Sequence, residues 1–242
     1  MGDDGYFDEE VAKTYDQNLS DTDPSLIRKT VDCLIDLSCD GDILEFAIGT
    51  GRVALPLAER GARVKGIELS SAMVRKLREK ESGEPIEVVL GDMTSTRVAG
   101  EFSLVFLVFN TIDNLTAQDA QIACFKNASR HLAPGGRFLV ETLLPPLQKL
   151  PFGETRLAFA RSDHHVGIDE FDITTQSYIS HHVWMTEDNH KYQSIPFRYA
   201  WPSELDLMAM MAGLELEFRW SDWDRSPFDR LSTQHVSVWR KA

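Results

Sequence analysis

Two glycines in a short turn are the first residues of this chain that could do chemistry. The stretch "LEFAIGTGRVA" (residues 44–54) reads as a buried strand that runs into Gly49 and Gly51 and then into a helix. Glycine allows a positive φ and lets a ligand approach the backbone closely. The helix that follows presents the positive end of its dipole to that ligand. The turn therefore predicts a site for a nucleotide-like ligand.

The same letters fit two cofactors. Gly49, Gly51 and Ala54 match the dinucleotide fingerprint G-x-G-x-x-G/A, in which the turn holds a pyrophosphate. Read from Glu45, they match E-x-A-x-G-x-G, which suits S-adenosylmethionine. A carboxylate at this strand end repels a pyrophosphate and attracts the ammonium group of a methionyl moiety. Glu45 therefore favours S-adenosylmethionine, although a carboxylate beside an ordinary tight turn stays an alternative.

Two further carboxylates end the next two expected strands. Glu68 closes "GIEL" and could accept hydrogen bonds from both ribose hydroxyls, a role shared by NAD and S-adenosylmethionine sites. Asp92 in "LGDM" could accept from an adenine amino group, while the backbone N–H of Met93 pairs with a ring nitrogen. The carboxyl ends of parallel strands meet at one edge of a sheet, so we expect the three acidic residues to line one ligand site.

The elements that must position these residues alternate between strand and helix. After a helix from Pro24 to Asp36, strands and helices alternate four times, which indicates an open α/β sheet with right-handed crossovers. The expected strands are 43–48, 63–69, 86–92, 102–110 and 137–142, and the expected helices are 53–58, 70–80 and 119–131. The run 102–110 is apolar throughout, as in a strand covered on both faces, and "APGG" (133–136) should end the last of these helices.

The chain changes character after residue 142. A proline-punctuated linker leads into residues 155–201, which are rich in β-branched and aromatic residues and contain a turn at 187–191 between two candidate strands. We expect a small inserted antiparallel sheet here. A capped helix after Pro202 ends at Gly213, and two strands, "LELEFRW" and "HVSVWRK", close the chain.

Composition narrows the possible partners. The 242 residues are 43% hydrophobic and 26% charged, with a formal net charge of −13, so a phosphate backbone is repelled and we expect no nucleic-acid partner. Cys33, Cys39 and Cys124 lack zinc-site spacing, and we expect inert thiols and no metal. The acidic N-terminus resembles no signal peptide and no apolar run is long enough to span a membrane, so a cytoplasmic protein without a membrane partner is expected.

Taken together, the motifs resemble those of the class I S-adenosylmethionine-dependent methyltransferases. The matching stretches are "LEFAIGTGR", "GIELSSAM", "LGDM", "LVFN" and "LAPGGRFLVE". The resemblance implies a Rossmann-like, mostly parallel sheet of seven strands with an antiparallel last strand. The inserted sheet looks most like the small-molecule branch that includes amino-sugar N-methyltransferases. The resemblance further implies two parts of the chain. Residues 1–150 and 202–242 would form a cofactor-binding domain, and residues 151–201 would form an antiparallel β lid over the active site.

The resemblance also assigns cofactor contacts by position. Residues 45–51 would line the methionyl moiety, Arg52 would approach its carboxylate, and Phe109 with Asn110 would lie under the sulfonium side. Glu68 would hold the ribose, Leu69 and Met73 would flank the adenine, and Tyr15 matches a tyrosine that folds over the cofactor in several relatives. The implied cofactor-binding set is Tyr15, Glu45, Ala47, Gly49, Thr50, Gly51, Arg52, Glu68, Leu69, Met73, Asp92, Met93, Phe109 and Asn110.

The acceptor is less defined by the sequence. Methyl transfer from a sulfonium depends mainly on alignment, so an amine need only arrive neutral, whereas a hydroxyl usually needs a base. Tyr15 and His182 are the candidate catalytic residues, and Asp222 with Asp224 could neutralise an amine. A small-molecule amine or hydroxyl is the expected acceptor, S-adenosyl-L-homocysteine the expected product, and a homodimer through the inserted sheet is possible.

Two departures and two alternatives accompany this interpretation. Ala47 stands where many relatives have Gly, and "FNTIDNL" lacks the "NPPY"-type motif of adenine-amino and glutamine-amide methylation. An NAD(P)-dependent oxidoreductase would explain the glycine turn and Glu68, but it leaves Glu45, Asp92 and "LAPGG" unexplained. A non-catalytic binding protein that keeps the fold is the second alternative.

Overall fold

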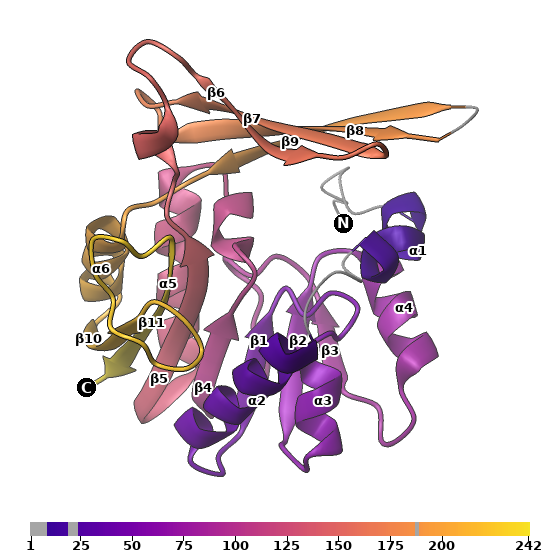
Figure 1. Cartoon of the computed structure of the whole chain (residues 1–242). Coiled ribbons are helices and arrows are strands. Elements are labelled where there is room, and N and C mark those ends of the chain that lie inside the picture. The colour runs from indigo at the N-terminus through magenta and orange to yellow at the C-terminus, as the bar shows by residue number, and fades with distance from the viewer. Residues whose placement is uncertain (1–8, 19–23, 187–188) are drawn as a thin grey trace.

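The computed structural model describes residues 9–18, 24–186 and 189–242, and its strands form two separate sheets (Figure 1). The larger sheet has seven strands in the order β10-β11-β5-β4-β1-β2-β3, and the smaller has four in the order β6-β7-β8-β9. Strands β1 to β5 pair in parallel, and β11 is antiparallel to both β5 and β10. The predicted seven-stranded, mostly parallel sheet with a reversed last strand is therefore confirmed.

The elements of the larger unit follow the expected alternation. Its strands are β1 (Ile43–Phe46), β2 (Val64–Glu68), β3 (Glu87–Leu90), β4 (Phe102–Leu107), β5 (Leu132–Leu143), β10 (Leu214–Trp220) and β11 (Gln234–Lys241). Its helices are α1 (Glu9–Asn18), α2 (Pro24–Ser38), α3 (Ala54–Glu59), α4 (Ser71–Lys80), α5 (Gln118–His131) and α6 (Pro202–Met211), with short 3-10 turns η1 (Thr111–Asn114) and η2 (Leu147–Lys149).

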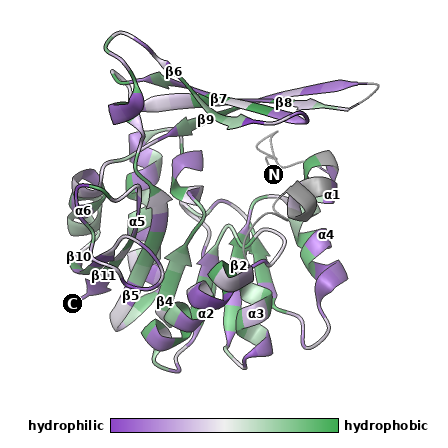
Figure 2. Ribbon diagram, in the orientation of Figure 1, coloured by the Kyte–Doolittle hydropathy of each residue, from purple (hydrophilic) through white to green (hydrophobic). Residues whose placement is uncertain are grey.

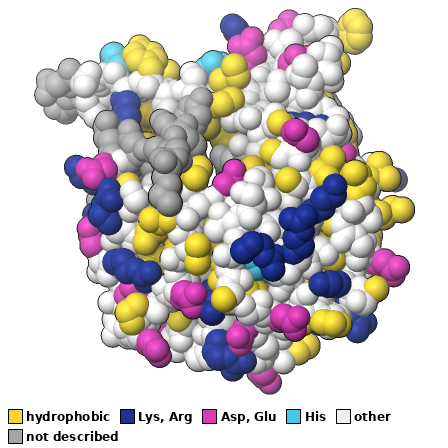
Figure 3. Space-filling view, turned by 180° about the vertical axis from the view of Figure 1, so that it is seen from behind, with side chains coloured by type: hydrophobic (Ala, Val, Ile, Leu, Met, Phe, Trp, Pro, Cys, Tyr) yellow, Lys and Arg dark blue, Asp and Glu magenta, His cyan; other side chains and the backbone are white. Residues whose placement is uncertain are grey.

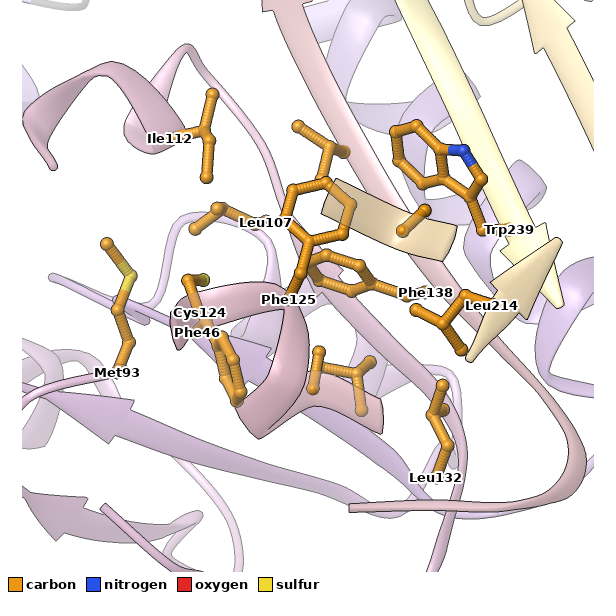
Figure 4. Packing of buried hydrophobic residues seen from close by; sticks show 14 of the residues in the cluster. Phe46, Met93, Leu107, Ile112, Cys124, Phe125, Leu132, Phe138, Leu214 and Trp239 are labelled. Carbon is orange, nitrogen blue, oxygen red and sulfur yellow. The ribbon is translucent and has the colours of Figure 1, made fainter. Parts of the chain in front are cut away.

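The central strands of the larger sheet are rich in hydrophobic residues, which Figure 2 colours green. Strands β1 and β4 are buried almost throughout, because α5 and α6 pack on one face and α2 and α3 on the other. On the α5 face, the ring of Phe125 lies 5.0 Å from that of Phe138 and 5.2 Å from that of Trp239, centroid to centroid (Figure 4). This packing anchors the reversed strand β11 to α5.

The smaller sheet lies across the carboxyl end of the larger one (Figure 1). It consists of β6 (Arg156–Arg161), β7 (His165–Asp172), β8 (Ser177–Met185) and β9 (His190–Arg198), all antiparallel. The predicted inserted antiparallel sheet is confirmed, with two strands more than the pair expected around the turn at 187–191. Glu187 and Asp188 of that turn lie outside the described residues.

Three local expectations were wrong. "APGG" belongs to the start of β5, where Gly135 has a φ of +76° and the pairing with β4 shifts register. The fourth strand stops at Leu107, because Phe109 and Asn110 take left-handed conformations with φ of +56° and +59°. Helix α6 begins at Pro202 without a side-chain cap, although Gly213 follows its end with the expected positive φ of +73°.

None of the helices in the described ranges is long and apolar enough to span a bilayer.

Candidate active site at the carboxyl edge

Glu45 stands at the end of β1 as a buried carboxyl with an unused oxygen. Its side chain is 5% exposed, and its Oε2 atom finds no hydrogen-bond partner among the described residues. Burial, followed by the nearby charge of Glu68, raises the pKa of Glu45 well above its ordinary value. A buried acceptor without a donor is unfavourable, so this oxygen is ready to accept a hydrogen bond from a cationic or N–H-bearing ligand.

Glu68 ends β2 next to the glycine turn. Its Oε2 accepts from the backbone N–H of Gly49 at 2.8 Å, and its Oε1 accepts from that of Ser70, also at 2.8 Å. The sequence predicted a ribose ligand, and the structure adds that Glu68 also holds the glycine turn in place. Each carboxylate oxygen can accept more than one hydrogen bond, so holding the turn does not by itself prevent Glu68 from binding a ligand hydroxyl.

The turn between β1 and α3 has the backbone that a close-approaching ligand requires. Ala47, Gly49 and Gly51 have φ of +53°, +57° and +79°, and Thr50 is fully buried. A Cβ atom added to Gly49 would meet only the carbonyl oxygen of Ala47, at 3.9 Å, so the space over Gly49 is open. A Cβ atom added to Gly51 would lie only 3.0 Å from the side chain of Leu55, so a glycine is needed here for close packing. Ala47, the departure from the family pattern, therefore occupies a strained position.

The expected adenine-side residues follow β2 and β3. Ser70 caps α4 by accepting from the N–H of Met73, whose side chain is buried, while Leu69 is 39% exposed. Asp92 is exposed, and Met93 beside it is buried in the core.

Helix α1 brings Tyr15 to this side of the sheet. Its Ala12 joins Ala72 and Met73 in a small apolar cluster, and Tyr15 packs against the same cluster. The structure therefore brings Tyr15 and Met73 together in one apolar cluster.

The turn after β4 carries the remaining cofactor candidates. The backbone N–H of Phe109 donates to Glu141 Oε2 at 2.6 Å, and Asn110 Oδ1 accepts from the N–H of Leu143 at 2.7 Å. The Arg52 guanidinium lies 4.0 Å from the centroid of the Phe109 ring, a cation–π contact. Two adjacent non-glycine residues in the left-handed region mark a strained turn, and such strain is concentrated at functional sites.

Glu141 was missed by the sequence reasoning. It is 7% exposed, and its pKa is raised by burial, with the Phe109 N–H and the charge of Arg52 opposing the rise. Its position inside an apolar strand gave no signal of its own, because the partners of its carboxylate come from other loops.

A second group of polar residues, also missed, links the sheet edge to the smaller sheet. Asp113 in η1 is 3% exposed, and its Oδ2 accepts from the hydroxyl of Tyr178 on β8 at 3.2 Å. Thr142 on β5 lies beside the same carboxyl. Asp113 stands in "FNTIDNL", whose letters suggested only a turn, so only the contact with β8 identifies it.

The contact between Tyr178 and Asp113 defines the inner face of the smaller sheet. Alternation along β8 places Tyr178, Ser180, His182 and Trp184 on that face, and cross-strand pairing adds Asp169. Of the neighbouring histidines in β8, His182 is the one that lies on the inner face. His181 points the other way, 3.5 Å from Glu170.

Both ring nitrogens of His182 are occupied. Nδ1 lies 3.0 Å from His165 Nε2, and Nε2 lies 3.2 Å from the hydroxyl of Ser180. Burial and the neighbouring His165 lower the pKa of His182 to about 4, so the imidazole is neutral at pH 7. This geometry suits a residue that organises the inner face better than a proton acceptor.

The two acidic residues expected to neutralise an amine have other partners. Asp224 pairs with Lys29 of α2 at 2.6 Å, and Asp222 Oδ1 accepts from the backbone N–H groups of Asp224 and Ser226. They hold the loop after β10 against α2. Among the described residues, no cluster of three or more His, Cys, Asp or Glu side chains could hold a metal ion.

The carboxyl groups and the glycine turn at this edge fit S-adenosylmethionine. The unused Oε2 of Glu45 lies beside an open glycine turn, and a second carboxyl, Glu68, lies close enough to repel it. Two adjacent carboxyls favour a cation and disfavour a pyrophosphate. These features define an α/β protein that binds a positively charged nucleoside cofactor across the carboxyl edge of its sheet.

Comparison with known proteins agrees with this class. Residues 43–136 match the family model described as a methyltransferase domain. The solved structure of the CcbJ methyltransferase from Streptomyces caelestis superposes with a TM-score of 0.85 at 37% identity, covering 96% of each chain. The cypemycin N-terminal methyltransferase of a Streptomyces species is 26% identical over 183 residues, 72% of either chain.

A third comparison shows the fold with its cofactor in place. The structure of CalS10 from Micromonospora echinaspora, an amino pentose methyltransferase with S-adenosylmethionine bound, has a TM-score of 0.70 at 20% identity, covering 89% of this chain and 90% of that one.

The chain therefore belongs to the S-adenosylmethionine-dependent methyltransferases. It is an enzyme that transfers the methyl group of S-adenosyl-L-methionine to a small-molecule acceptor, with S-adenosyl-L-homocysteine as product. The fingerprint shared with dinucleotide enzymes reflects the common need for a tight turn at this edge, so the oxidoreductase alternative is set aside.

Proposed function

We propose that the acceptor is a small-molecule amine and that the enzyme is an N-methyltransferase. The observation that carries this proposal is the inner face of the smaller sheet, where Phe171, Tyr178 and Phe197 form a stacked ladder with centroid spacings of 5.3 and 5.0 Å. Asp169 stands on the same face as a partly buried carboxyl. Aromatic faces and carboxylates together attract a cationic amine.

Two further points support an amine. The cypemycin enzyme is named for an N-terminus, which is itself an amine. A hydroxyl acceptor usually needs a general base, and the inner-face His182 has both nitrogens occupied and a pKa lowered to about 4.

Matched acceptors test this proposal. The full-length protein would be incubated with S-adenosylmethionine and either an amine or its hydroxyl counterpart, such as tyramine or tyrosol and glucosamine or glucose. We expect methylated product, followed by mass spectrometry, from amines only. Methylation of hydroxyl compounds without methylation of amines would overturn the proposal.

We also propose that the cofactor-site residues have the roles that the resemblance implies. Glu45 and the glycine turn would hold the methionyl end, Glu68 the ribose, and Asp92 with Met93 the adenine. The sulfonium supplies an activated methyl group, and the chain's own residues orient the two reactants and exclude water. Tyr15 would close over the cofactor from α1, and His182 would shape the acceptor side.

Residues 1–150 and 202–242 would form the cofactor-binding domain, and residues 151–201 would act as its lid. The position of the smaller sheet across the carboxyl end supports this division (Figure 1). We further propose that the enzyme is cytoplasmic. Its net charge of −13 supports the proposal that it has no nucleic-acid partner, because a phosphate backbone is repelled.

A homodimer through the outer face of the smaller sheet is also proposed. Ile179 and Tyr192 on that face are 41% and 73% exposed, and Val183 lies between them opposite Tyr192. Hydrophobic side chains are visible at the surface of this sheet in Figure 3. Sedimentation of the wild type and of Ile179→Asp tests the dimer, because a charge on the outer face should shift the equilibrium to monomer. Identical sedimentation of both proteins would contradict it.

A further inference from the structure

One polar contact ties the sheet edge to the lid sheet and is not used by the cofactor site. Asp113 in η1 and Tyr178 in β8 are separated by 65 positions in the chain, yet the Tyr178 hydroxyl donates to Asp113 Oδ2 at 3.2 Å. Asp113 is only 3% exposed. The carboxyl is thus held where the inner face of the lid sheet meets the carboxyl edge of the main sheet.

The nearest positive charge is already committed elsewhere. Arg198 on β9 acts on Asp113 electrostatically, but its guanidinium donates to Glu204 at 2.7 Å and also to Gln121. Burial raises the pKa of Asp113 from its ordinary value of 3.8 to about 7, against the opposing effects of Tyr178, Arg198 and Thr142. The ionised carboxylate is therefore under-compensated by the protein itself.

A second buried polar group lies at the same place. Thr142 on β5 is 1% exposed, and its hydroxyl lies close enough to Asp113 to favour the ionised carboxylate. No other group in the described part of the chain bonds to this hydroxyl. A hydroxyl can accept a hydrogen bond as well as donate one, so the carboxyl and the hydroxyl together suit a ligand that carries several N–H donors.

The surroundings favour a cation in particular. Tyr178 stacks with Phe171 at 5.3 Å and with Phe197 at 5.0 Å, so aromatic rings line the approach to Asp113. Asp169 on β7 lies near enough to Tyr178 to act on it electrostatically. Tyr178, Arg198 and Asp169 are the titratable or charged groups that face this position from the lid strands.

We propose that Asp113, together with the hydroxyl of Thr142, anchors the ammonium group of the acceptor and so determines specificity for amines. The ligand class is a primary or secondary alkylammonium that bears an apolar or aromatic body. An N–H of the ammonium donates to the carboxylate and another to Thr142 Oγ1. Transfer of the first proton to the Asp113 carboxylate then leaves a neutral amine, whose lone pair accepts the methyl group. This inference rests on the proposed methylation of an amine and names the residue that selects it.

The test uses a matched pair of probes on the full chain saturated with S-adenosylhomocysteine. 4-Fluorobenzylamine is a cation at neutral pH and 4-fluorobenzyl alcohol is its uncharged counterpart, and fluorine NMR titration measures both affinities. We expect the amine to bind at least tenfold more tightly than the alcohol. The proposal is overturned if protein that binds S-adenosylhomocysteine has equal affinity for the amine and the alcohol, or does not bind the amine. Failure to bind S-adenosylhomocysteine would instead count against the cofactor site.

Two variants and one pH series localise the effect. Asp113→Asn should remove the preference for the amine and leave the alcohol unchanged, whereas Tyr178→Phe, which removes the hydroxyl but keeps the carboxyl and the ring, should retain the preference within a few-fold. In the wild type, amine affinity should rise between pH 6 and 8 as Asp113 ionises, with a flat alcohol profile. If Asp113→Asn keeps the preference for the amine over the alcohol, the proposal is overturned. If that variant does not fold, the proposal is overturned by an affinity of the wild type for the amine that does not change with pH.

Discussion

The buried carboxyl of Asp113 should make the stability of the protein depend on pH. Its pKa is 3.8 in an ordinary environment and about 7 in the folded protein, chiefly because of burial. Below pH 3.8 the carboxyl is protonated in both states. Between pH 3.8 and 7 the unfolded chain loses this proton while the folded protein keeps it, so the free energy of unfolding falls as pH rises.

The size of the effect follows from the interval between the two pKa values. At 1.36 kcal/mol per pH unit, the interval from 3.8 to about 7 corresponds to roughly 4 kcal/mol. Asn has the shape of the protonated carboxyl, accepts the Tyr178 hydrogen bond and does not titrate. The stability of Asp113→Asn relative to wild type should therefore increase by about 2–3 kcal/mol between pH 5 and 8.

Urea unfolding followed by tryptophan fluorescence measures this difference, since the chain has five Trp residues. For a chain of this length, the same change corresponds to a relative shift of very roughly 4–12 °C in melting temperature. Asp163→Asn, at an exposed turn between β6 and β7, is the matched control and should show no such trend. Parallel stability–pH curves for wild type and Asp113→Asn would refute the assignment of a buried, titrating carboxyl.

Three further changes probe the cofactor edge. Glu45→Gln should weaken S-adenosylhomocysteine binding by about 10–100-fold in calorimetric titration, because it removes a charge-assisted hydrogen bond to an ammonium. Equal affinities of the variant and the wild type would exclude that contact. Ala47→Gly should raise the free energy of unfolding by up to about 1 kcal/mol, since it relieves a left-handed Ala at φ +53° while adding chain entropy, and a clear loss of stability would contradict the strain. Asn110→Ala should destabilise by about 1–2 kcal/mol, and more than Asn110→Gly, because Ala loses both the hydrogen bond to Leu143 and the tolerance for φ +59°; equal losses in thermal melts would show that the turn is unstrained.

Hydrophobic patterning was enough to locate most elements of the main sheet. The continuous apolar run before Phe109 predicted a strand covered on both faces, and β4 is such a strand. It was not enough to end that strand correctly. Phe109 and Asn110 leave the strand conformation because the Phe109 N–H is drawn to Glu141 and Asn110 Oδ1 to the Leu143 N–H. These partners lie more than 30 positions away, so no local pattern announces them.

The candidate acceptor side shows the same limit. Asp222 and Asp224 were conspicuous in the sequence because they flank a Trp, yet Asp224 is paired with Lys29 and Asp222 caps its own loop. Asp113 was inconspicuous, because a single Asp in a turn carries no periodicity or motif. Its burial depends on contact with β8, whose Tyr178 lies 65 positions further along the chain.

The sequence alone was enough to favour this class of enzyme and its methyl donor, because Glu45, Glu68 and the glycine turn directly follow strands that local hydrophobic patterning predicts. Only the folded structure reveals which polar groups are buried away from water, among them Glu45 Oε2, Thr142 Oγ1 and the carboxyl of Asp113. Burial and desolvation are properties of surfaces brought together from distant segments. They therefore arise only when these segments pack together in the folded protein.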